Sequence, residues 1–206
     1  MPAIDHLVYV VPDVDAGVEQ IEAATGVRAA AGGAHEGRGT HNALLAFDDT
    51  TYLEIIGPDP GQPEPAGPRP FGVTADSVPH LATFAVHPVG DESLADVVGQ
   101  LGPTGVPFGE PEPMSRARPD GTLLSWQLAL PTAGGGVVPF AIDWGDTPNP
   151  AGSLPVLGRL HTLLVTHPDE AVRAAIGGID DRIRVTEGRA SLMAVINTLE
   201  GQLTLR

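Results

Sequence analysis

Four polar residues that lie in otherwise apolar segments are the first candidates for chemistry in this sequence. They alternate between imidazole and carboxylate along the chain and are His6, Glu54, His80 and Asp143. Such groups rarely sit among aliphatic side chains without a cation or a hydrogen-bonding partner. If related structural units bring the four positions to one cavity, two nitrogens and two oxygens define a site for a divalent first-row metal ion. The remaining coordination positions would be open to water or substrate.

Three further residues are candidate substrate ligands. His41 follows Gly39-Thr40 and could point into the same cavity, and Arg116 and Arg118 share the stretch 107–121. The length of that stretch and its Pro-Asp-Gly turn predict a loop suited to a lid, and paired guanidinium groups can hold a carboxylate or a phosphate. The other histidines have no matching acidic partner, and we expect them to be structural or exposed: His35, His87, His161 and His167.

Each candidate also has a purely structural interpretation. A histidine such as His6 can be satisfied by a backbone carbonyl or by a neighbouring aspartate, and Asp143 can cap the turn that follows its strand. Surface arginines near acidic patches are ordinary in so acidic a chain. The sequence alone leaves both interpretations open.

A repeated element must position these residues. The segment 4–11 has two similar copies, 80–87 and 160–167, and each copy precedes a proline, acidic residues and a short helical pattern. Spaced self-similarity of this kind predicts a repeated structural unit. Alternate side chains of a strand point to opposite faces, so His6 shares a face with Val8 and Val10.

Each copy opens a unit that we predict to be βαβββ, over about 1–57, 78–146 and 157–206. The first predicted helix starts at Pro12-Asp13, the second lies around residues 94–101 and the third includes residues 172–179. The later strands are 41–47, 52–56, 122–130, 137–144, 183–186, 191–198 and 201–205, together with a short strand within 27–39 and a weak one before the loop 107–121. Stretches rich in proline and glycine, 58–70 and 148–158, separate the units. No unit buries enough apolar surface alone, so we expect one α+β domain over 1–206.

Composition limits the partners and the chemistry. The 206 residues include 11 Lys and Arg against 26 Asp and Glu, a formal net charge of −15, which argues against binding to nucleic acid. There is no cysteine, which excludes disulfides and thiolate ligands, and no lysine, which excludes a Schiff base. We find no membrane span or secretory signal and expect a cytoplasmic protein with a small-molecule ligand.

Several motifs occurring in order resemble the bacterial glyoxalase-like domain family of the vicinal oxygen chelate superfamily. They are Asp5-His6-Leu7, the stretch 32–45, Tyr52-Leu53-Glu54-Ile55-Ile56, the stretch 115–121 and Pro139-Phe140-Ala141-Ile142-Asp143-Trp144. The resemblance covers most of residues 4–150 and implies a cupped mixed sheet made of paired βαβββ units. It also implies metal ligands in the first and fourth strands of each unit, positions on which His6, Glu54, His80 and Asp143 fall.

The resemblance implies a fold more specifically than a reaction. In a lyase or isomerase of the glyoxalase type, zinc, nickel, cobalt, manganese or iron would polarise vicinal oxygens of the substrate, with Glu54 or Asp143 as the catalytic base. A facial triad of His6, His80 and one carboxylate would instead suit an iron-dependent ring-cleaving dioxygenase. A metal-free binding module is the third alternative. The sequence also leaves open whether the third unit completes the cup or replaces the partner of a homodimer.

Overall fold

A computed structural model describes residues 1–117, 121–134 and 136–206 of the chain. The first unit contains β1 (Ala3–Val10), α1 (Val14–Thr25), β2 (Ala30–His35), β3 (Thr40–Ala46) and β4 (Tyr52–Pro58). The second contains β5 (His80–His87), α2 (Leu94–Leu101), β6 (Glu112–Ala117), β7 (Leu123–Ala129) and β8 (Phe140–Asp143). The third contains β9 (Arg159–Thr166), α3 (Glu170–Gly177), β10 (Ile183–Thr186), β11 (Ser191–Thr198) and β12 (Gly201–Leu205).

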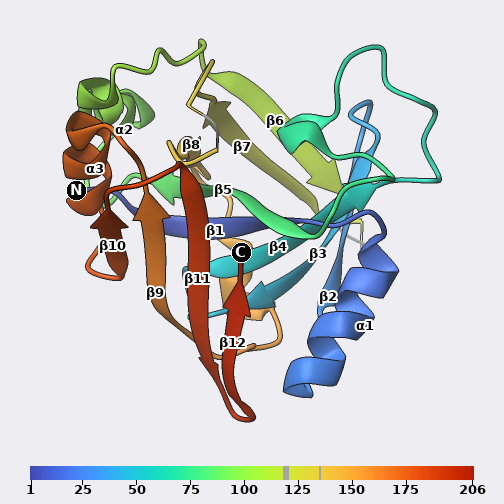
Figure 1. Cartoon of the computed structure of the whole chain (residues 1–206). Coiled ribbons are helices and arrows are strands. Elements are labelled where there is room, and N and C mark those ends of the chain that lie inside the picture. The colour runs from blue at the N-terminus through green and yellow to red at the C-terminus, as the bar shows by residue number, and fades with distance from the viewer. Residues whose placement is uncertain (118–120, 135) are drawn as a thin grey trace.

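The first two units form one eight-stranded cupped sheet (Figure 1), in the order β2-β3-β4-β1-β5-β8-β7-β6. In each unit the first strand pairs in parallel with the fourth, β1 with β4 and β5 with β8, and β1 and β5 pair antiparallel at the centre. The same pairing on both sides of the centre relates the units by a pseudo-two-fold axis. The edge strands β2 and β6 approach each other, and an ion pair of 3.2 Å joins Arg38 to Glu112 between them. The predicted α+β fold with a cupped sheet is confirmed.

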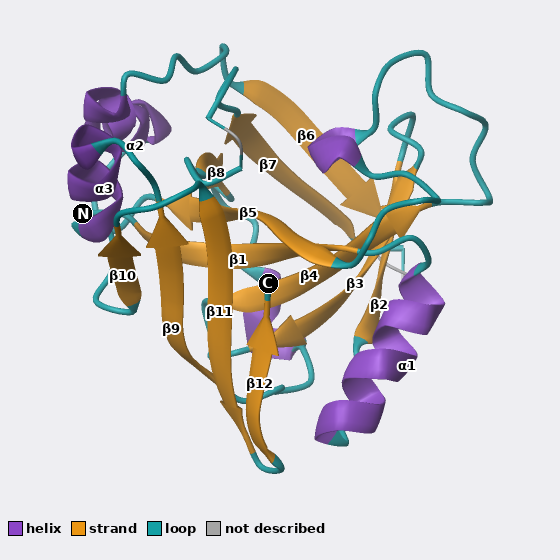
Figure 2. Ribbon diagram, viewed as in Figure 1, coloured by secondary structure: helices purple, strands orange, loops and turns teal. Residues whose placement is uncertain are grey.

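The helices begin and end where local chemistry requires. Asp13 caps α1 by accepting a hydrogen bond from the backbone N–H of Ala16, and Gly26 ends the helix with a positive φ of 71°. Ser93 and Asp96 form a capping box at the start of α2. Helix α1 buries the apolar stripe that the sequence predicts, Val14, Val18 and Ile21, against the outer face of the cup, so the concave face stays free (Figure 2).

The third unit forms a separate four-stranded sheet in the order β10-β9-β11-β12. Its first strand pairs in parallel with its second, β10, instead of with its last, so it does not repeat the topology of the other two units. It is joined to them by a backbone hydrogen bond of 2.7 Å from Leu81 to Arg206 and an ion pair of 3.0 Å between Arg182 and Asp48. The cup is therefore made by the first and second units. None of the described helices is long and apolar enough to cross a membrane.

One predicted loop is partly a strand. The stretch 107–121 is predicted to be a long loop, but residues 112–117 form β6, which pairs with β7 in an antiparallel register. A proline is compatible with this strand because β6 is at the edge of the sheet. Arg116 therefore lies on the wall of the cup, and it is only 4 % exposed.

Candidate functional site

A cavity of about 1050 Å³ extends from the concave face of the cup to the sheet of the third unit. Alternate residues of the strands line it, because a strand presents every second side chain to one face. The polar lining gathers on β1, β3 and β4 of the first unit, through His6, Asn42, Tyr52 and Glu54. On β8 of the second unit the lining is apolar, through Phe140 and Ile142. The two halves of the cup therefore differ in chemistry.

A buried Asp–His pair lies at the first strand. The register between β1 and β5 shifts between Ile4 and His6, and such a bulge redirects side chains. Adjacent Asp5 and His6 can then contact each other, with 2.6 Å between Asp5 Oδ1 and His6 Nδ1. Because a carboxylate only accepts hydrogen bonds, His6 Nδ1 carries the hydrogen and donates it. Nε2 is then the free nitrogen, on a ring that lines the cavity.

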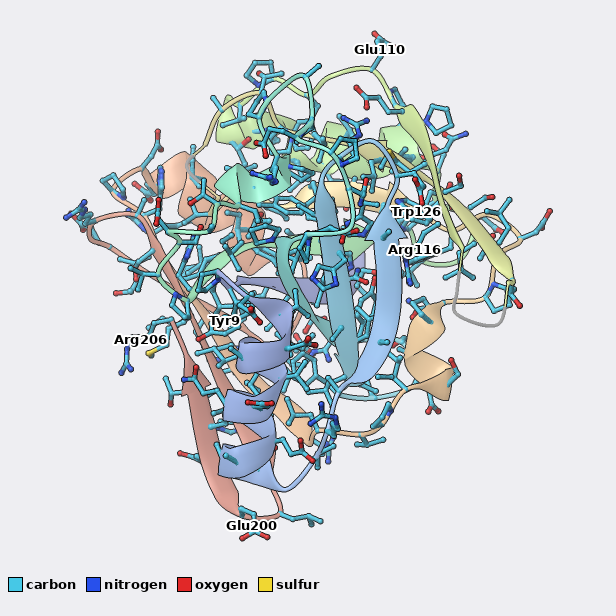
Figure 3. The ribbon with its side chains drawn as sticks, turned by 90° about the vertical axis from the view of Figure 1, so that its right-hand side faces the viewer. Tyr9, Glu110, Arg116, Trp126, Glu200 and Arg206 are labelled. Atoms are coloured by element: carbon cyan, nitrogen blue, oxygen red, sulfur yellow. The ribbon has the colours of Figure 1, made fainter. Side chains whose placement is uncertain are left out.

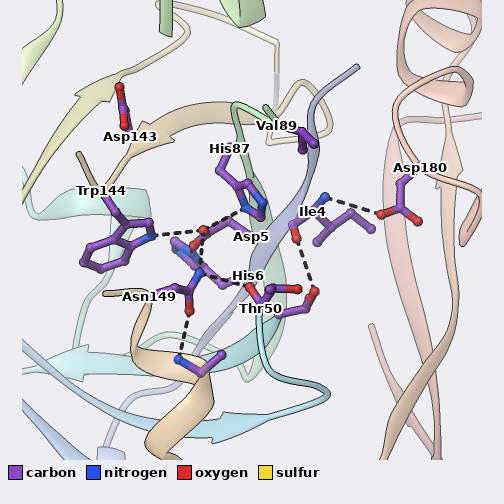
Figure 4. A network of polar contacts seen from close by, with 12 residues as sticks. Ile4, Asp5, His6, Thr50, His87, Val89, Asp143, Trp144, Asn149 and Asp180 are labelled. Atoms are coloured by element: carbon purple, nitrogen blue, oxygen red, sulfur yellow. Dashed lines mark hydrogen bonds and ion pairs between the residues drawn. The ribbon is translucent and has the colours of Figure 1, made fainter. Parts of the chain in front are cut away.

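Asp5 is the centre of a wider network (Figure 4). Its side chain is fully buried, and Oδ2 accepts hydrogen bonds from His87 Nδ1 at 3.0 Å, Trp144 Nε1 at 3.0 Å and Asn149 Nδ2 at 3.1 Å. Burial by itself raises the pKa of Asp5, but the hydrogen bonds from His6 and His87 outweigh it, and the net pKa is below its usual value. Asp5 is therefore an ionised carboxylate that holds the His6 ring in one orientation and one tautomer.

Glu54 faces the same cavity from β4. Its Oε2 lies 3.7 Å from His6 Nε2, and its Oε1 accepts a hydrogen bond of 2.6 Å from Asn42 Nδ2. The same amide lies 3.3 Å from His35 Nε2, while His35 Nδ1 contacts Thr40 Oγ1 at 3.0 Å. The amide nitrogen of Asn42 donates to both the Glu54 carboxylate and His35 Nε2. His35 Nε2 is therefore an acceptor, and the ring hydrogen is on Nδ1, which donates it to Thr40 Oγ1. Burial lowers the pKa of His35, which agrees with a neutral ring.

Gly32 fixes the amide of Asn42. A Cβ on Gly32 would lie 1.9 Å from Asn42 Oδ1, so only glycine leaves room for this orientation of the amide. Asn42 Oδ1 is buried and has no hydrogen-bond partner among the described residues. The packing therefore places the oxygen of Asn42 against the backbone of β2 and its nitrogen toward Glu54.

Arg116 adds a positive charge on the opposite wall. It lines the cavity from β6, and its charge acts on His35 and on Tyr52, so it lies near the Glu54 end of the cup. Tyr52 stacks on the His6 ring with a centroid distance of 4.6 Å. Burial, followed by the carboxylates of Asp5 and Glu54, raises the pKa of Tyr52 well above its usual value, so it remains a neutral phenol.

A row of aromatic rings extends from His6 to Phe71, which lies in the segment that connects β4 to β5. Phe140 meets the His6 ring edge-on at 5.4 Å, and Phe71 stacks on Phe140 at 5.5 Å. Phe71 has a φ of 55°, an unusual conformation for a residue other than glycine. Such strain persists only where the surrounding structure demands it. The segment that connects β4 to β5 therefore contributes a side chain to the cavity.

The structure brings together some of the sequence-predicted residues and separates others. His6, Glu54 and Arg116 line one region of the cavity. His80 lies opposite Val10 in the central ladder, four residues along β1 from His6 and so about 13 Å away at roughly 3.3 Å per residue. Its Nδ1 lies 2.7 Å from the carbonyl oxygen of Val78, and its side chain is exposed.

Asp143 and His41 lie on the other faces of their strands. Phe140 and Ile142 point into the cavity, whereas the Asp143 carboxylate accepts a hydrogen bond of 2.9 Å from the backbone N–H of Gly145 and stands apart from the Asp5 network in Figure 4. His41 alternates with Asn42 and does not line the cavity. Arg118 lies outside the described residues.

The donors do not fit the four-ligand metal site that the resemblance implies. Among the described residues no three His, Asp or Glu side chains converge on a point that could hold a metal ion. His6 Nε2 and Glu54 Oε2 are one pair open to the cavity, but His35 Nε2 is turned to the amide of Asn42, and Ala85 stands opposite His6 in the second unit. We therefore derive no step through a metal.

Sequence reasoning did not single out Asp5 or Asn42, and it predicted that His35 would be structural or exposed. Asp5 is adjacent to His6, and the strand alternation sends neighbours to opposite faces, so only the bulge makes their contact. Asn42 follows His41 in the stretch 32–45, and the pairing of β3 with β2 and β4 decides which of the two faces the cup. The glycines at 32 and 33 were the available signal, because a glycine in a strand often marks close packing.

Comparisons with known proteins agree with this architecture. Residues 4–177 match the model of the family described as "Glyoxalase-like domain". No curated protein is similar to the chain in sequence. A hypothetical protein from Staphylococcus aureus has a similar structure, with a TM-score of 0.69 and 14 % identity over 100 % of this chain and 99 % of that chain.

Two other similar structures are those of enzymes. One is a variant of the Streptomyces coelicolor methylmalonyl-CoA epimerase in complex with 2-nitronate-propionyl-CoA, at 20 % identity and a TM-score of 0.49, covering 73 % of this chain and 100 % of that chain. The other is a catechol 2,3-dioxygenase, at 14 % identity and a TM-score of 0.42, covering 87 % of this chain and 56 % of that chain.

Proposed function

The chain belongs to the glyoxalase-like domain family of the vicinal oxygen chelate superfamily, and from this premise we propose that its cup binds a small organic acid or ketone and moves a proton on it. His6 is the proposed base, and it acts on a C–H bond next to a carbonyl group. The observation that carries the proposal is the buried pair of Asp5 and His6, joined at 2.6 Å on a ring that lines the cavity.

The Asp5 carboxylate prepares His6 for this role. With Nδ1–H donated to Asp5, the lone pair of neutral His6 is on Nε2. When Nε2 takes the proton, the C–H bond breaks and an N–H bond forms. The electron pair of the C–H bond becomes the C=C bond of an enolate, and the π pair of the carbonyl group moves onto its oxygen. The imidazolium that results is stabilised by Asp5 on one side and by Glu54 on the other. This is general base catalysis by an oriented imidazole.

Arg116 and Glu54 complete the proposed reaction. The guanidinium of Arg116 lies on the opposite wall and would hold a carboxylate or the enolate oxygen, for which its planar donors are well suited. Glu54, 3.7 Å from His6 Nε2, is close enough to share the same substrate. Return of the proton to another carbon, or to the other face of the same carbon, would give an isomerisation.

The second candidate is a binding module that holds the same ligand without chemistry. It is favoured by the apolar lining of the second unit, where Phe140, Ile142 and Trp126 stand opposite the polar wall. Both candidates need the cavity, but only the first needs the tautomer that Asp5 imposes on His6.

Hydrogen–deuterium exchange on the substrate distinguishes the two candidate functions. The protein is incubated in D2O with a panel of α-keto acids and α-hydroxyketones, and loss of the proton NMR signal next to the carbonyl is followed. We expect exchange with at least one compound, slowed on the order of 100-fold or more in His6→Gln. His80→Gln, which changes a second histidine of the cavity, is the matched control and should exchange like the wild type. Binding of a panel member without exchange would favour the binding module.

A further inference from the structure

We infer that the ligand is an amphipathic α-keto or α-hydroxy acid with an aliphatic chain, whose chain occupies a compartment between the cup and the sheet of the third unit. The inference rests on the proposed function for the polar end of the ligand. It adds the class of substrate and assigns a role to the third unit.

The cavity is long in one direction. His6 and His80 both line it, and they are about 13 Å apart along the central ladder at roughly 3.3 Å per residue. Arg116 and Arg206 also both line it, and they lie on opposite sides of the molecule in Figure 3. A volume of about 1050 Å³ is at the upper end of what drug-sized ligands occupy. A ligand of only three or four carbons would leave most of this space to water.

The polar groups that could do chemistry are at one end. His6, Glu54 and Arg116 are 4, 7 and 4 % exposed, so their hydrogen bonds and charges act in a largely dry environment. At the other end, an opening of the cavity is lined by the exposed side chains of His80 and Arg206. The exposed side chains of Arg38 and Glu112 also line the cavity, at the rim where β2 and β6 approach each other. The ligand head therefore belongs at the buried end and its chain points toward the opening.

Aliphatic side chains of the second and third units line the path between these ends. The first strand of the second unit contributes Leu81, and the segment after β7 contributes Val137 and Val138. The third unit contributes Leu164 and Met193, which are directly opposite each other in the β9–β11 ladder. Leu164 and Met193 are only half-buried, so they have apolar surface available to a ligand. A methylene chain is the occupant that matches such a wall.

The test compares α-keto acids of increasing length, α-ketobutyrate, α-ketooctanoate and α-ketododecanoate, by isothermal titration calorimetry. We expect Kd to fall by about fourfold for each methylene that enters the compartment. Met193→Trp fills the compartment and should remove most of the gain for the two longer acids while leaving α-ketobutyrate unchanged. Val195→Trp, on the same face of β11 but outside the cavity, is the matched control and should bind like the wild type.

The outcomes separate this inference from the proposed function. Equal affinity for all three acids, or a gain with length that Met193→Trp does not reduce, would overturn the chain compartment. If α-ketobutyrate still exchanges its proton in that case, the role of His6 stands. A dependence on length without proton exchange on any of the acids would leave the compartment in place and remove the catalytic role.

Discussion

The two halves of the cup have the same strand pairing and different chemistry. In the first unit, the concave face carries His6, Asn42 and Glu54, and all of them are hydrogen-bonded or within 4 Å of another polar group. In the second unit, the central strands carry Ala85, Phe140 and Ile142, which belong to an apolar cluster that also includes Val8, Val10 and Ile56 of the first unit. The pairing of β1 with β4 is repeated by β5 with β8, so backbone topology alone does not explain the difference.

The difference shows how a repeated fold can produce a one-sided site. Pseudo-symmetry supplies two equivalent positions, but the segment 80–87 has Ala82 where the segment 4–11 has His6. One half can then provide the imidazole and the carboxylate, and the other provides Arg116 and an apolar wall for the rest of the ligand. The predictions below would break or sharpen this contrast, and they run from the largest expected effect to the smallest.

The two carboxylates of the repeat should differ most. We expect Glu54→Gln to slow proton exchange on the order of 100-fold, because it removes a negative charge 3.7 Å from His6 Nε2. Asp143→Asn should leave exchange unchanged, because that carboxylate only caps the turn at Gly145. Both rates are measured by NMR in D2O under the same conditions. Equal losses in the two variants would contradict a one-sided site.

Removing the charge of Asp5 should destabilise the fold. Asp5→Asn is expected to cost about 3 kcal/mol in the free energy of unfolding, since it breaks a buried ionic network. Because the pKa of Asp5 is lowered by folding, its contribution is present above its unfolded pKa and is lost as pH falls through the folded value. Urea unfolding at neutral pH and at acidic pH measures both effects. A variant as stable as the wild type at neutral pH would show that Asp5 is not the centre of the network.

Gly32 should be intolerant of a side chain. Gly32→Ala places a Cβ on the oxygen of Asn42, and we expect a loss of about 2 kcal/mol because the buried amide must move. Gly67→Ala is the control, since a Cβ there meets no atom within 4 Å, and its stability should change little. Thermal unfolding measures the two variants. Equal melting temperatures would indicate that the Asn42 amide has another available orientation.

The neutral state of His35 should appear in the pH dependence of stability. Folding lowers its pKa through burial, so below its ordinary value of 6.5 the unfolded chain binds a proton that the folded chain does not. Stability is therefore lost as pH falls through this range, and His35→Gln should lose less. His161→Gln, on an exposed histidine of β9, is the control. A steeper loss in His35→Gln than in the wild type would reverse the assigned sign.

The smallest effect is expected when metal is added, because the protein should retain little of it. Two donors open to the cavity do not make a site for tight binding, so we expect protein loaded with zinc, nickel, cobalt, manganese or iron to lose the ion on dialysis. Elemental mass spectrometry measures the retained amount beside His6→Ala. One equivalent retained by the wild type and lost in that variant would show that the cup recruits a further ligand.

Much of the architecture could be predicted from local patterns. The alternation of His6, Val8 and Val10 placed His6 on the cavity face, and the stripe on α1 faces the core as predicted. Glu54 lies on the same face of its strand as Tyr52 and Ile56, as alternation requires. These outcomes follow from the side-chain repeat, which is 2 residues in a strand and 3.6 residues in a helix. Each repeat is a property of a single element and needs no information about its neighbours.

Only the tertiary structure decided the composition of the site. The bulge at Asp5, the register that sets His80 opposite Val10, and the packing of Gly32 on Asn42 all depend on contacts between strands distant in the sequence. A shift of one residue in any of these registers reverses which side chains face the cup. The sequence alone therefore determined the repeated units, the acidic charge and the polar residue types, while long-range strand pairing selected the few that meet.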